Sequence, residues 1–304
     1  PYFPKNLTEI VSPFFGGGSI EIHYASQGVR VHGYDIFEPL VNFWQHVQRD
    51  PEGIADMLEA FFHPCTKESF GKYQKKQSWS DMDTTHYLWQ EMRACMYYAL
   101  NRSSFSGATL SGGYSQQAAD KRFTQSSIDR LRDFSCTSLT VEQADFTDSL
   151  GRHDDETFIY ADPPYLLEKS TLYGERGSTH KDFDHESFAE EIKKKNNWVI
   201  SYNPHPEILE LYKDYEIVYP EWTMGMKNVY THEETQIRKT IKSCQQVLGT
   251  IDDDPAFNED REVVQEIKSA LASLLSHHTK SMGKAKEILI LNVKENNNAL
   301  LIDD

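Results

Sequence analysis

Short apolar runs alternate with helical periodicity along the first 50 residues of the chain. Strands are predicted over residues 9–15 and 29–34, and helices over 19–27 and 39–46. In the first helix, Ser19 is the expected cap, and Ile20, Ile22 and Tyr24 are the expected apolar positions. This order of strands and helices favours a parallel sheet whose strands are joined by crossover helices.

The pattern changes between residues 50 and 135, where no strand–helix rhythm is visible. Helical periodicity appears over residues 54–62, 84–100 and 128–134. Residues 101–117 are rich in Ser, Gly and Asn, which predicts a loop or a loose hairpin. We therefore expect a mainly helical subdomain inserted over residues 50–135.

The alternation of strands and helices returns after residue 135. Strands are predicted over 138–143, 157–161, 198–202, 215–219 and 288–293, and helices over 186–195 and 206–212. The strand over 288–293 is a candidate partner of the strand over 215–219. Between these two strands, residues 242–283 contain an acidic turn, Asp252-Asp253-Asp254-Pro255, and a predicted helix over 259–276, which together indicate an insertion.

The whole pattern predicts a doubly wound, Rossmann-like α/β sheet. Residues 1–49 and 136–304 form one domain, and residues 50–135 form the inserted subdomain. With 304 residues, of which 38% are hydrophobic, the chain is long enough to bury a core of this kind.

Cysteine spacing and hydropathy indicate the cellular compartment in which the protein is expected. The four cysteines are scattered and form no C-x-x-C pair, so neither a disulfide framework nor a zinc site is expected, and a reducing compartment fits. No apolar run approaches the roughly 20 residues that span a bilayer, and the first residues do not resemble a signal peptide. We expect an intracellular protein without a membrane partner; the pattern indicates no oligomeric state.

The charge of the chain is strongly negative but unevenly distributed. The net charge is −16, whereas a basic balance is the usual sign of nucleic-acid binding. Residues 65–132, however, contain ten Lys and Arg against six Asp and Glu, and residues 250–304 contain six against eleven. The global charge argues weakly against a nucleic-acid partner, and the local excess of cations argues weakly for one.

A glycine-rich turn, Phe15-Gly16-Gly17-Gly18-Ser19, lies between the first predicted strand and helix. Glycines let a backbone approach a ligand closely, and a helix N-terminus offers free N–H groups. An ordinary strand–helix turn would explain the same residues. Asp35, at the end of the next predicted strand, favours a nucleoside ligand, because an acid there can accept hydrogen bonds from ribose hydroxyls. A solvated loop aspartate is the alternative.

Asp162-Pro163-Pro164-Tyr165 directly follows the buried strand predicted over residues 157–161. Two prolines fix the backbone and remove two N–H donors, which leaves carbonyl acceptors beside the Asp162 carboxylate. Such a group suits an aromatic amine, which donates two hydrogen bonds while its ring stacks on Tyr165. Holding both hydrogens exposes the nitrogen lone pair for attack on a methyl sulfonium. A simple Pro-Pro turn is the alternative, and no metal is expected, since the twelve histidines form no H-E-x-x-H pattern.

These motifs occur in an order that resembles the Dam-like (D12-class, α-group) DNA adenine-N6 methyltransferases. The resemblance includes Ser12-Pro13-Phe14 before the glycine turn and Gly33-Tyr34 before Asp35. Three further stretches carry it: residues 98–107, 200–203 and 287–292. It covers most of residues 9–241 and returns at 286–293. It implies methyl transfer from S-adenosylmethionine to the N6 amine of a flipped adenine in double-stranded DNA, in a DNA-associated intracellular protein.

The resemblance also implies a role for particular residues. Phe15, Gly16 and Gly18 would line the methionine part of S-adenosylmethionine, and Asp35 would hold its ribose. Asp145 and Phe146 would meet the cofactor adenine, and Asp162 would face both the cofactor and the target amine. The insertion over residues 50–135 matches the target-recognition region of the family.

Contacts to DNA are expected from polar and cationic side chains of this insertion. Asn101, Arg102, Ser104 and Phe105 lie in one stretch that suits a phosphate contact combined with base contact or wedging. A serine-rich surface loop is the alternative. Further phosphate contacts are expected from a cationic set, for which a merely solvated face is equally plausible: Lys72, Lys75 and Lys76 beside Tyr73, and Lys121 and Arg122.

Two departures from the family pattern keep other activities open. An aromatic-Gly-Gly-Lys segment usually precedes the glycine turn, but this sequence starts at Pro1-Tyr2-Phe3-Pro4 and has no such segment. A trimmed chain and a protein that binds its cofactor weakly are the two explanations. The acidic insertion over 242–283 is also unusual. The alternatives are methylation of cytosine N4 or of RNA adenine, and a non-catalytic DNA-binding relative. Asp162 favours adenine, because cytosine-N4 enzymes more often have Ser there.

Overall fold

The computed structural model describes residues 2–77, 87–166, 183–220 and 287–293. The chain divides into two units, Pro1–Ile217 with Leu289–Asp304 and Val218–Ile288, and nearly all described residues belong to the first. The predicted insertion over 242–283 and its helix lie outside the described residues.

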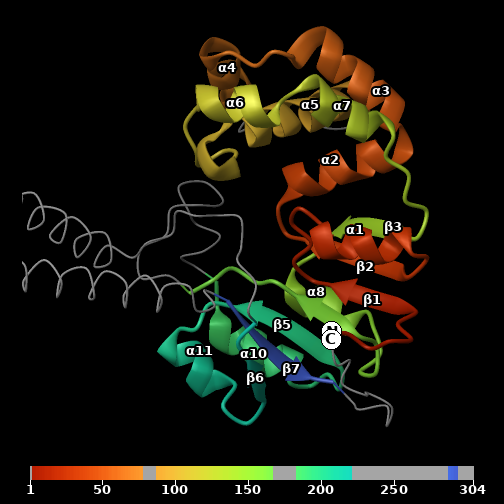
Figure 1. Ribbon diagram of the computed structural model, residues 1–304, viewed down its shortest axis with the longest axis vertical. Helices are drawn as coiled ribbons and strands as arrows, with labels where there is room; N and C mark the ends of the chain where they lie inside the picture. The colour runs from red at the N-terminus through yellow and green to blue at the C-terminus, as the bar shows by residue number, and fades with distance from the viewer. Residues whose placement is uncertain (1, 78–86, 167–182, 221–286, 294–304) are drawn as a thin grey trace, which may run out of the picture. The chain divides into compact units, whose positions relative to one another are not determined.

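A seven-stranded sheet organises the first unit, and its strand order is β3-β2-β1-β4-β5-β7-β6 (Figure 1). The strands are β1 (Glu9–Ser12), β2 (Arg30–Asp35), β3 (Leu139–Gln143), β4 (Ile159–Ala161), β5 (Trp198–Tyr202), β6 (Glu216–Val218) and β7 (Ile288–Asn292). The pairs β1–β2, β1–β4, β2–β3 and β4–β5 are parallel. The mainly parallel sheet is confirmed, as is the pairing of the strand near residue 290 with the strand near 217.

Helices connect and cover these strands. They are α1 (Ser19–Ser26), α2 (Glu38–Arg49), α8 (Phe146–Gly151), α10 (His185–Ile192) and α11 (Pro206–Leu211). α1 and α2 both contact β2 and β3, while α8 contacts β2 and α10. β5 is buried along its whole length, as its mainly apolar sequence predicts.

The buried face of α1 differs from the predicted one. Gly18, in a left-handed conformation, is the N-cap, and Ser19 is already the first helical residue. Glu21 and Ala25 are buried, whereas Ile20 is 36% exposed. The predicted apolar positions alternate along the chain, and such positions cannot share one face of a helix. Glu21 and Ala25 are four residues apart, so they lie on the same face, and this face is the buried one.

The stretch predicted as a helical insertion contains helices and no strand among its described residues. They are α3 (Pro51–Met57), η1 (Leu58–Phe62), α4 (Lys67–Gln77), α5 (Tyr87–Ser103), η2 (Phe105–Gly107), α6 (Gln116–Arg122) and α7 (Gln125–Arg132). α5 contacts α2, α4 and α6. No helix in the described parts of the chain is long and apolar enough to cross a membrane.

The loop predicted over residues 101–117 is wrong at its start. α5 continues through Ser103, and residues from 116 belong to α6. Asn and Ser have modest helix propensity, but packing of Leu100 and Ser103, both fully buried, extends the helix. α4 was missed because few apolar side chains mark it in the sequence.

Candidate active site

The glycine turn lies between β1 and α1 and is joined to β2 by a backbone hydrogen bond. The Phe15 N–H donates to the Tyr34 carbonyl over 2.8 Å. Gly16 and Gly18 have φ angles of 50° and 64°, a region that strains residues with a Cβ. The shape of the turn therefore depends on glycine at these two positions.

The Phe15 ring packs inside the turn. It is 2% exposed and meets the indole of Trp44 edge-on, with 5.6 Å between ring centroids. A Cβ on Gly18 or Gly33 would approach the ring to 2.5 Å or 2.3 Å. These glycines make room for the Phe15 ring, and the ligand contact expected of Phe15 stays a prediction.

Asp35 connects the end of β2 to the glycine turn. Its Oδ2 accepts the Gly16 N–H at 3.0 Å, and its Oδ1 accepts the Phe37 N–H at 2.9 Å. Burial raises the pKa of Asp35 from its ordinary value, and these two hydrogen bonds oppose that rise. Each oxygen retains acceptor capacity for a ribose hydroxyl.

Asp145 follows β3 and begins α8. Its carboxylate caps the helix by accepting the Asp148 N–H at 2.8 Å. The preceding residue, Ala144, donates its N–H to the Asp35 carbonyl at 3.3 Å, so the ends of β2 and β3 are held together. The two acids predicted to meet one cofactor thus lie on adjacent strand ends.

Phe146 belongs to an aromatic cluster that the sequence did not indicate. Its ring centroid lies 6.1 Å from that of Phe14, 5.7 Å from that of Phe183 and 5.4 Å from that of Phe188. Phe14 follows β1, whereas Phe183 precedes α10 and Phe188 lies within it. Phe14, Phe146 and Phe183 are only partly buried, which leaves apolar surface for a flat ring beside Asp145.

Asp162, Pro163 and Pro164 leave the carboxyl end of β4. Asp162 is exposed, Pro163 is buried and Pro164 is partly buried. Ala161, the last residue of β4, is fully buried between neighbouring strands. The exposed carboxylate is therefore attached to a rigid strand end.

Hydrogen bonds to the end of β5 hold the rest of this loop. The Tyr165 hydroxyl and the Ser201 Oγ lie 2.8 Å apart, and Ser201 is 1% exposed. Asn203 Nδ2 donates to the Leu166 carbonyl at 2.8 Å. These contacts give a role to the stretch at residues 200–203: it orients Tyr165.

The predicted site residues collect at one edge of the sheet. Strands β3, β2, β1, β4 and β5 are mutually parallel, so their carboxyl ends meet at the same edge, where open α/β sheets bind ligands. The side chains and turns that follow these ends are Asp145, Asp35, Gly16–Gly18, Asp162 and Ser201.

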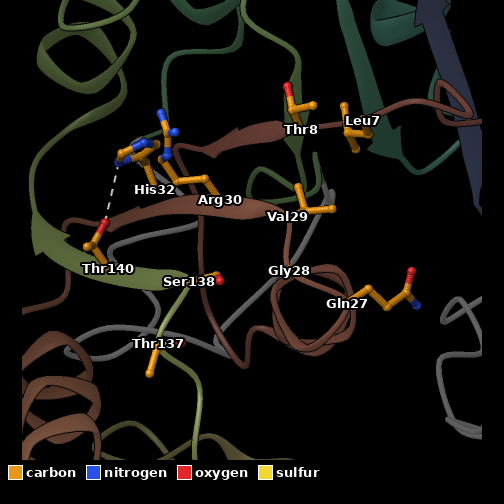
Figure 2. A pocket seen from close by; sticks show the side chains of 10 residues that line it. All are labelled: Leu7, Thr8, Gln27, Gly28, Val29, Arg30, His32, Thr137, Ser138 and Thr140. Carbon is orange, nitrogen blue, oxygen red and sulfur yellow. Dashed lines mark hydrogen bonds between the residues drawn. The ribbon is translucent and has the colours of Figure 1, made fainter.

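A hollow of about 650 Å³ lies at the opposite edge (Figure 2). It is lined by residues just before or at the start of β1, β2 and β3, including Thr8, Gly28 and Ser138. His32 and Thr140 lie side by side at its rim, with 3.4 Å between His32 Nδ1 and Thr140 Oγ1 (Figure 2). None of the predicted site residues lines this hollow.

Glu21 is a buried acid that the sequence analysis missed. It is 3% exposed, and Ser12 Oγ donates to its Oε1 at 2.7 Å. Burial raises the pKa of Glu21 to about 7; the Ser12 hydrogen bond opposes the rise, and the negative charge of Asp162 adds to it. In the sequence, Glu21 lies between two isoleucines, a pattern that predicts an acid on the polar face of a helix. The sequence therefore did not indicate that Glu21 is buried.

The polar stretch predicted to contact DNA, residues 101–106, covers the end of α5 and the start of η2. Residues 104–115, which follow α5, are called the α5–η2 loop below. Asn101 Nδ2 donates to the Gly107 carbonyl at 3.2 Å. Ser104 is fully buried, and its hydroxyl accepts the Thr109 N–H at 3.1 Å, so this side chain supports the loop instead of facing solvent. Phe105, in contrast, is 65% exposed.

Arg102 and Arg122 flank the α5–η2 loop. The Arg102 guanidinium lies over the Tyr98 ring at 5.1 Å. Arg122 donates to the Ser104 carbonyl, and both burial and the charge of Arg102 lower the pKa of Arg122. Arg122 thus supports the loop from within, and a contact with phosphate stays a prediction for both arginines.

The cations of α4 and α6 differ in their surroundings. Lys72 pairs with Glu68 at 2.7 Å on the exposed side of α4. Lys75 and Lys121 are exposed, and Lys76 is partly buried. The structure places these lysines on helices of the predicted insertion, and their contact with DNA stays a prediction.

The sequence was compared with known proteins. Residues 1–226 match the family described as D12 class N6 adenine-specific DNA methyltransferase. The chain is also 24% identical, over 233 residues, to the type II methyltransferase M1.LlaDCHI of Lactococcus lactis subsp. cremoris, covering 70% of this chain and 78% of that protein. Because the family match spans most of the chain, the protein belongs to the D12 class of N6 adenine-specific DNA methyltransferases.

Proposed function

We propose that Asp162, Pro163 and Tyr165 hold the amine of the target adenine. The carboxylate of Asp162 and the carbonyl of Pro163 each accept one amine hydrogen, and the Tyr165 ring stacks on the base. The hydrogen bond between Tyr165 and Ser201 carries this proposal, because it fixes the ring next to the exposed carboxylate. A fixed acceptor and a fixed ring orient the amine before reaction.

We further propose that the glycine turn, Asp35 and Asp145 hold S-adenosylmethionine. The fit rests on the open backbone at Gly16 and Gly17, where a Cβ would meet no atom within 4 Å, and on the two adjacent acids. Partly buried Phe146 suits an adenine ring. When bound, the cofactor supplies a methyl group activated by a sulfonium. The protein supplies orientation, hydrogen-bond acceptors and exclusion of water.

The helical segment over residues 50–135 is the proposed target-recognition subdomain, and residues 1–49 and 136–304 the proposed catalytic domain. Adenine N6 lies inside the duplex, so the base must be flipped out at a cost of a few kcal/mol. Phe105 supports the assignment, because a ring that is 65% exposed on a hydrogen-bonded loop can fill the vacated space. Asn101, Arg102, Lys75, Lys76 and Arg122 are the proposed polar contacts.

Asp162→Ala tests the proposed centre. The variant should fold like the wild type, since Asp162 is exposed, and should lose at least about 100-fold in methyl-transfer rate because an acceptor of the amine is gone. Transfer of labelled methyl from S-adenosylmethionine to duplex DNA measures the rate. Asp133→Ala, which removes an acid just after α7, is the matched control and should keep its activity.

Two outcomes would contradict the proposal. Wild-type-like transfer by Asp162→Ala would remove Asp162 from the reaction. Label on a duplex that lacks adenine would show that the pocket accepts another amine.

A further inference from the structure

We propose that Trp44 is a positioning residue for the cofactor, and that it directs the Gly17 N–H toward the carboxylate of S-adenosylmethionine. The inference rests on the proposed role of the glycine turn in holding this cofactor. It assigns a function to a side chain of α2 that neither the sequence motifs nor the mechanism above uses.

Two side chains hold the backbone of Gly16. Asp35 Oδ2 accepts the Gly16 N–H at 3.0 Å, and Trp44 Nε1 donates to the Gly16 carbonyl at 3.2 Å. Gly16 has a left-handed backbone with a φ of 50°. Because glycine populates this region about as readily as the ordinary one, the two hydrogen bonds select one of several conformations that are open to the turn.

The hydrogen bond from Trp44 also sets the direction of the next N–H along the chain. A peptide unit is planar and trans, so its carbonyl and its N–H point in opposite directions. The Gly16 carbonyl points to the indole on α2, and the Gly17 N–H therefore points away from that helix. Among the described residues this N–H has no acceptor, and a Cβ on Gly17 would meet no atom within 4 Å. The Gly17 N–H is thus an open hydrogen-bond donor.

Three aromatic rings restrict the indole of Trp44. Its ring centroid lies 5.6 Å from that of Phe15, 5.2 Å from that of Phe43 and 5.7 Å from that of Phe134. Phe15 belongs to the turn, Phe43 is the preceding residue on α2, and Phe134 follows α7. Because the indole is already held, its N–H can fix the turn at little further cost in side-chain entropy.

The methionine part of S-adenosylmethionine carries a suitable partner for the open donor. Its carboxylate can accept a backbone N–H, and a hydrogen bond to a charged oxygen is about twice as strong as one between neutral groups. The ammonium group of the same part has no acceptor capacity. An N–H at this place therefore favours the carboxylate.

The test compares the dissociation constants of S-adenosylmethionine and of decarboxylated S-adenosylmethionine, which lacks only the carboxylate. Isothermal titration calorimetry of the whole protein without DNA measures both. The wild type should bind S-adenosylmethionine at least about tenfold more tightly than the decarboxylated form. Trp44→Phe keeps a ring beside Phe15 but has no N–H. Its dissociation constant for S-adenosylmethionine should rise by about fivefold to tenfold, whereas that for the decarboxylated form should stay within about twofold of the wild-type value.

Gln48→Ala is the matched control. Gln48 also lies on α2 and donates a hydrogen bond to the sheet, but its acceptor is the Leu139 carbonyl of β3, at 2.7 Å. This variant should bind both ligands like the wild type. A loss equal to that of Trp44→Phe would assign the effect to the packing of α2 as a whole and would overturn the role of Trp44.

Equal affinity of the wild type and Trp44→Phe for S-adenosylmethionine would also overturn the inference, as would an equal loss for both ligands. Equal binding of both ligands by the wild type would do the same, and this measurement decides the question if Trp44→Phe fails to fold.

Asp145→Ala separates the inference from the proposed cofactor site. Asp145 is proposed to meet the adenine ring, which both ligands carry, so its loss should weaken the binding of both. If it does so while Trp44→Phe binds like the wild type, the cofactor site stands and the role of Trp44 does not. Unchanged binding of both ligands by Asp145→Ala would count against the proposed cofactor site itself.

Discussion

At the scale of single residues, the ring of Phe15 restricts two neighbouring positions to glycine. Its ring occupies the space that a side chain at Gly18 or Gly33 would need. Gly18 is also required by its φ of 64°, but Gly33 lies within β2 and has no such requirement. The resemblance implied a ligand contact for Phe15, whereas the structure adds a packing role that organises the turn.

Gly33→Ala should destabilise the protein by about 1–3 kcal/mol, the usual penalty for overpacking a core. The new Cβ would lie 2.3 Å from the Phe15 ring, which is held by Trp44. Thermal unfolding followed by circular dichroism measures the change. Gly17→Ala, where a Cβ would meet no atom within 4 Å, is the control and should unfold near the wild-type temperature. Equal unfolding temperatures for both variants would argue against the packing role.

At the scale of elements, the α5–η2 loop combines rigidity with an exposed aromatic ring. The Phe105 N–H donates to the Gly113 carbonyl at 3.0 Å, and Ser104 forms a bridge with Tyr114. Ser106 adopts a φ of 53°, which is uncommon for a residue other than glycine and is often found at functional sites. The loop therefore presents Phe105 without needing to order it on binding.

Phe105→Ala should weaken binding to the substrate duplex by about tenfold, because stacking of one base on an aromatic ring contributes about 1–3 kcal/mol. The salt dependence of binding should not change, since no cation is removed. Fluorescence anisotropy at several salt concentrations measures both quantities. Phe61→Ala, which removes a ring that is 76% exposed on η1, is the control and should bind within about twofold of the wild type. Equal losses in both variants would remove the special role of the α5–η2 loop.

At the scale of the whole molecule, the buried acid near the active site lowers stability at neutral and alkaline pH. The pKa of Glu21 rises from 4.5 in the unfolded chain to about 7 in the folded one. The folded state therefore binds the proton more tightly, and stability is greatest below pH 4.5 and is lost as pH rises to about 7.

Glu21→Gln should be more stable than the wild type above pH 7.5 by on the order of 3 kcal/mol, because a pKa difference of about 2.5 corresponds to about 1.4 kcal/mol for each unit. At pH 5 the difference should be small, since Glu21 is then largely protonated in the folded state. Urea unfolding at both pH values measures it. A stability difference that does not change with pH would show that Glu21 does not titrate in this range.

Much of the fold was readable from local pattern. The mainly apolar residues 198–202 predicted β5 with its observed bounds, and alternating strands and helices predicted a mainly parallel sheet. The order of the motifs along the chain also predicted the family. The motifs follow successive strands, and parallel strands bring the residues at their carboxyl ends to one edge of the sheet. These features could be predicted because each depends on residues that are close together in the sequence.

Other features exist only once distant segments pack. Three examples show this: Ser201 orients Tyr165, Phe15 fills the space of Gly33, and Glu21 is buried next to the end of β1. α5 continues past Leu100 because its face packs on other helices, against the weak propensity of Asn and Ser. Thus the order of motifs along the sequence determined the family and the reaction. The tertiary structure decided which groups are buried, oriented and able to shift one another's pKa, because burial and electrostatic coupling depend on through-space distance, which local sequence does not encode.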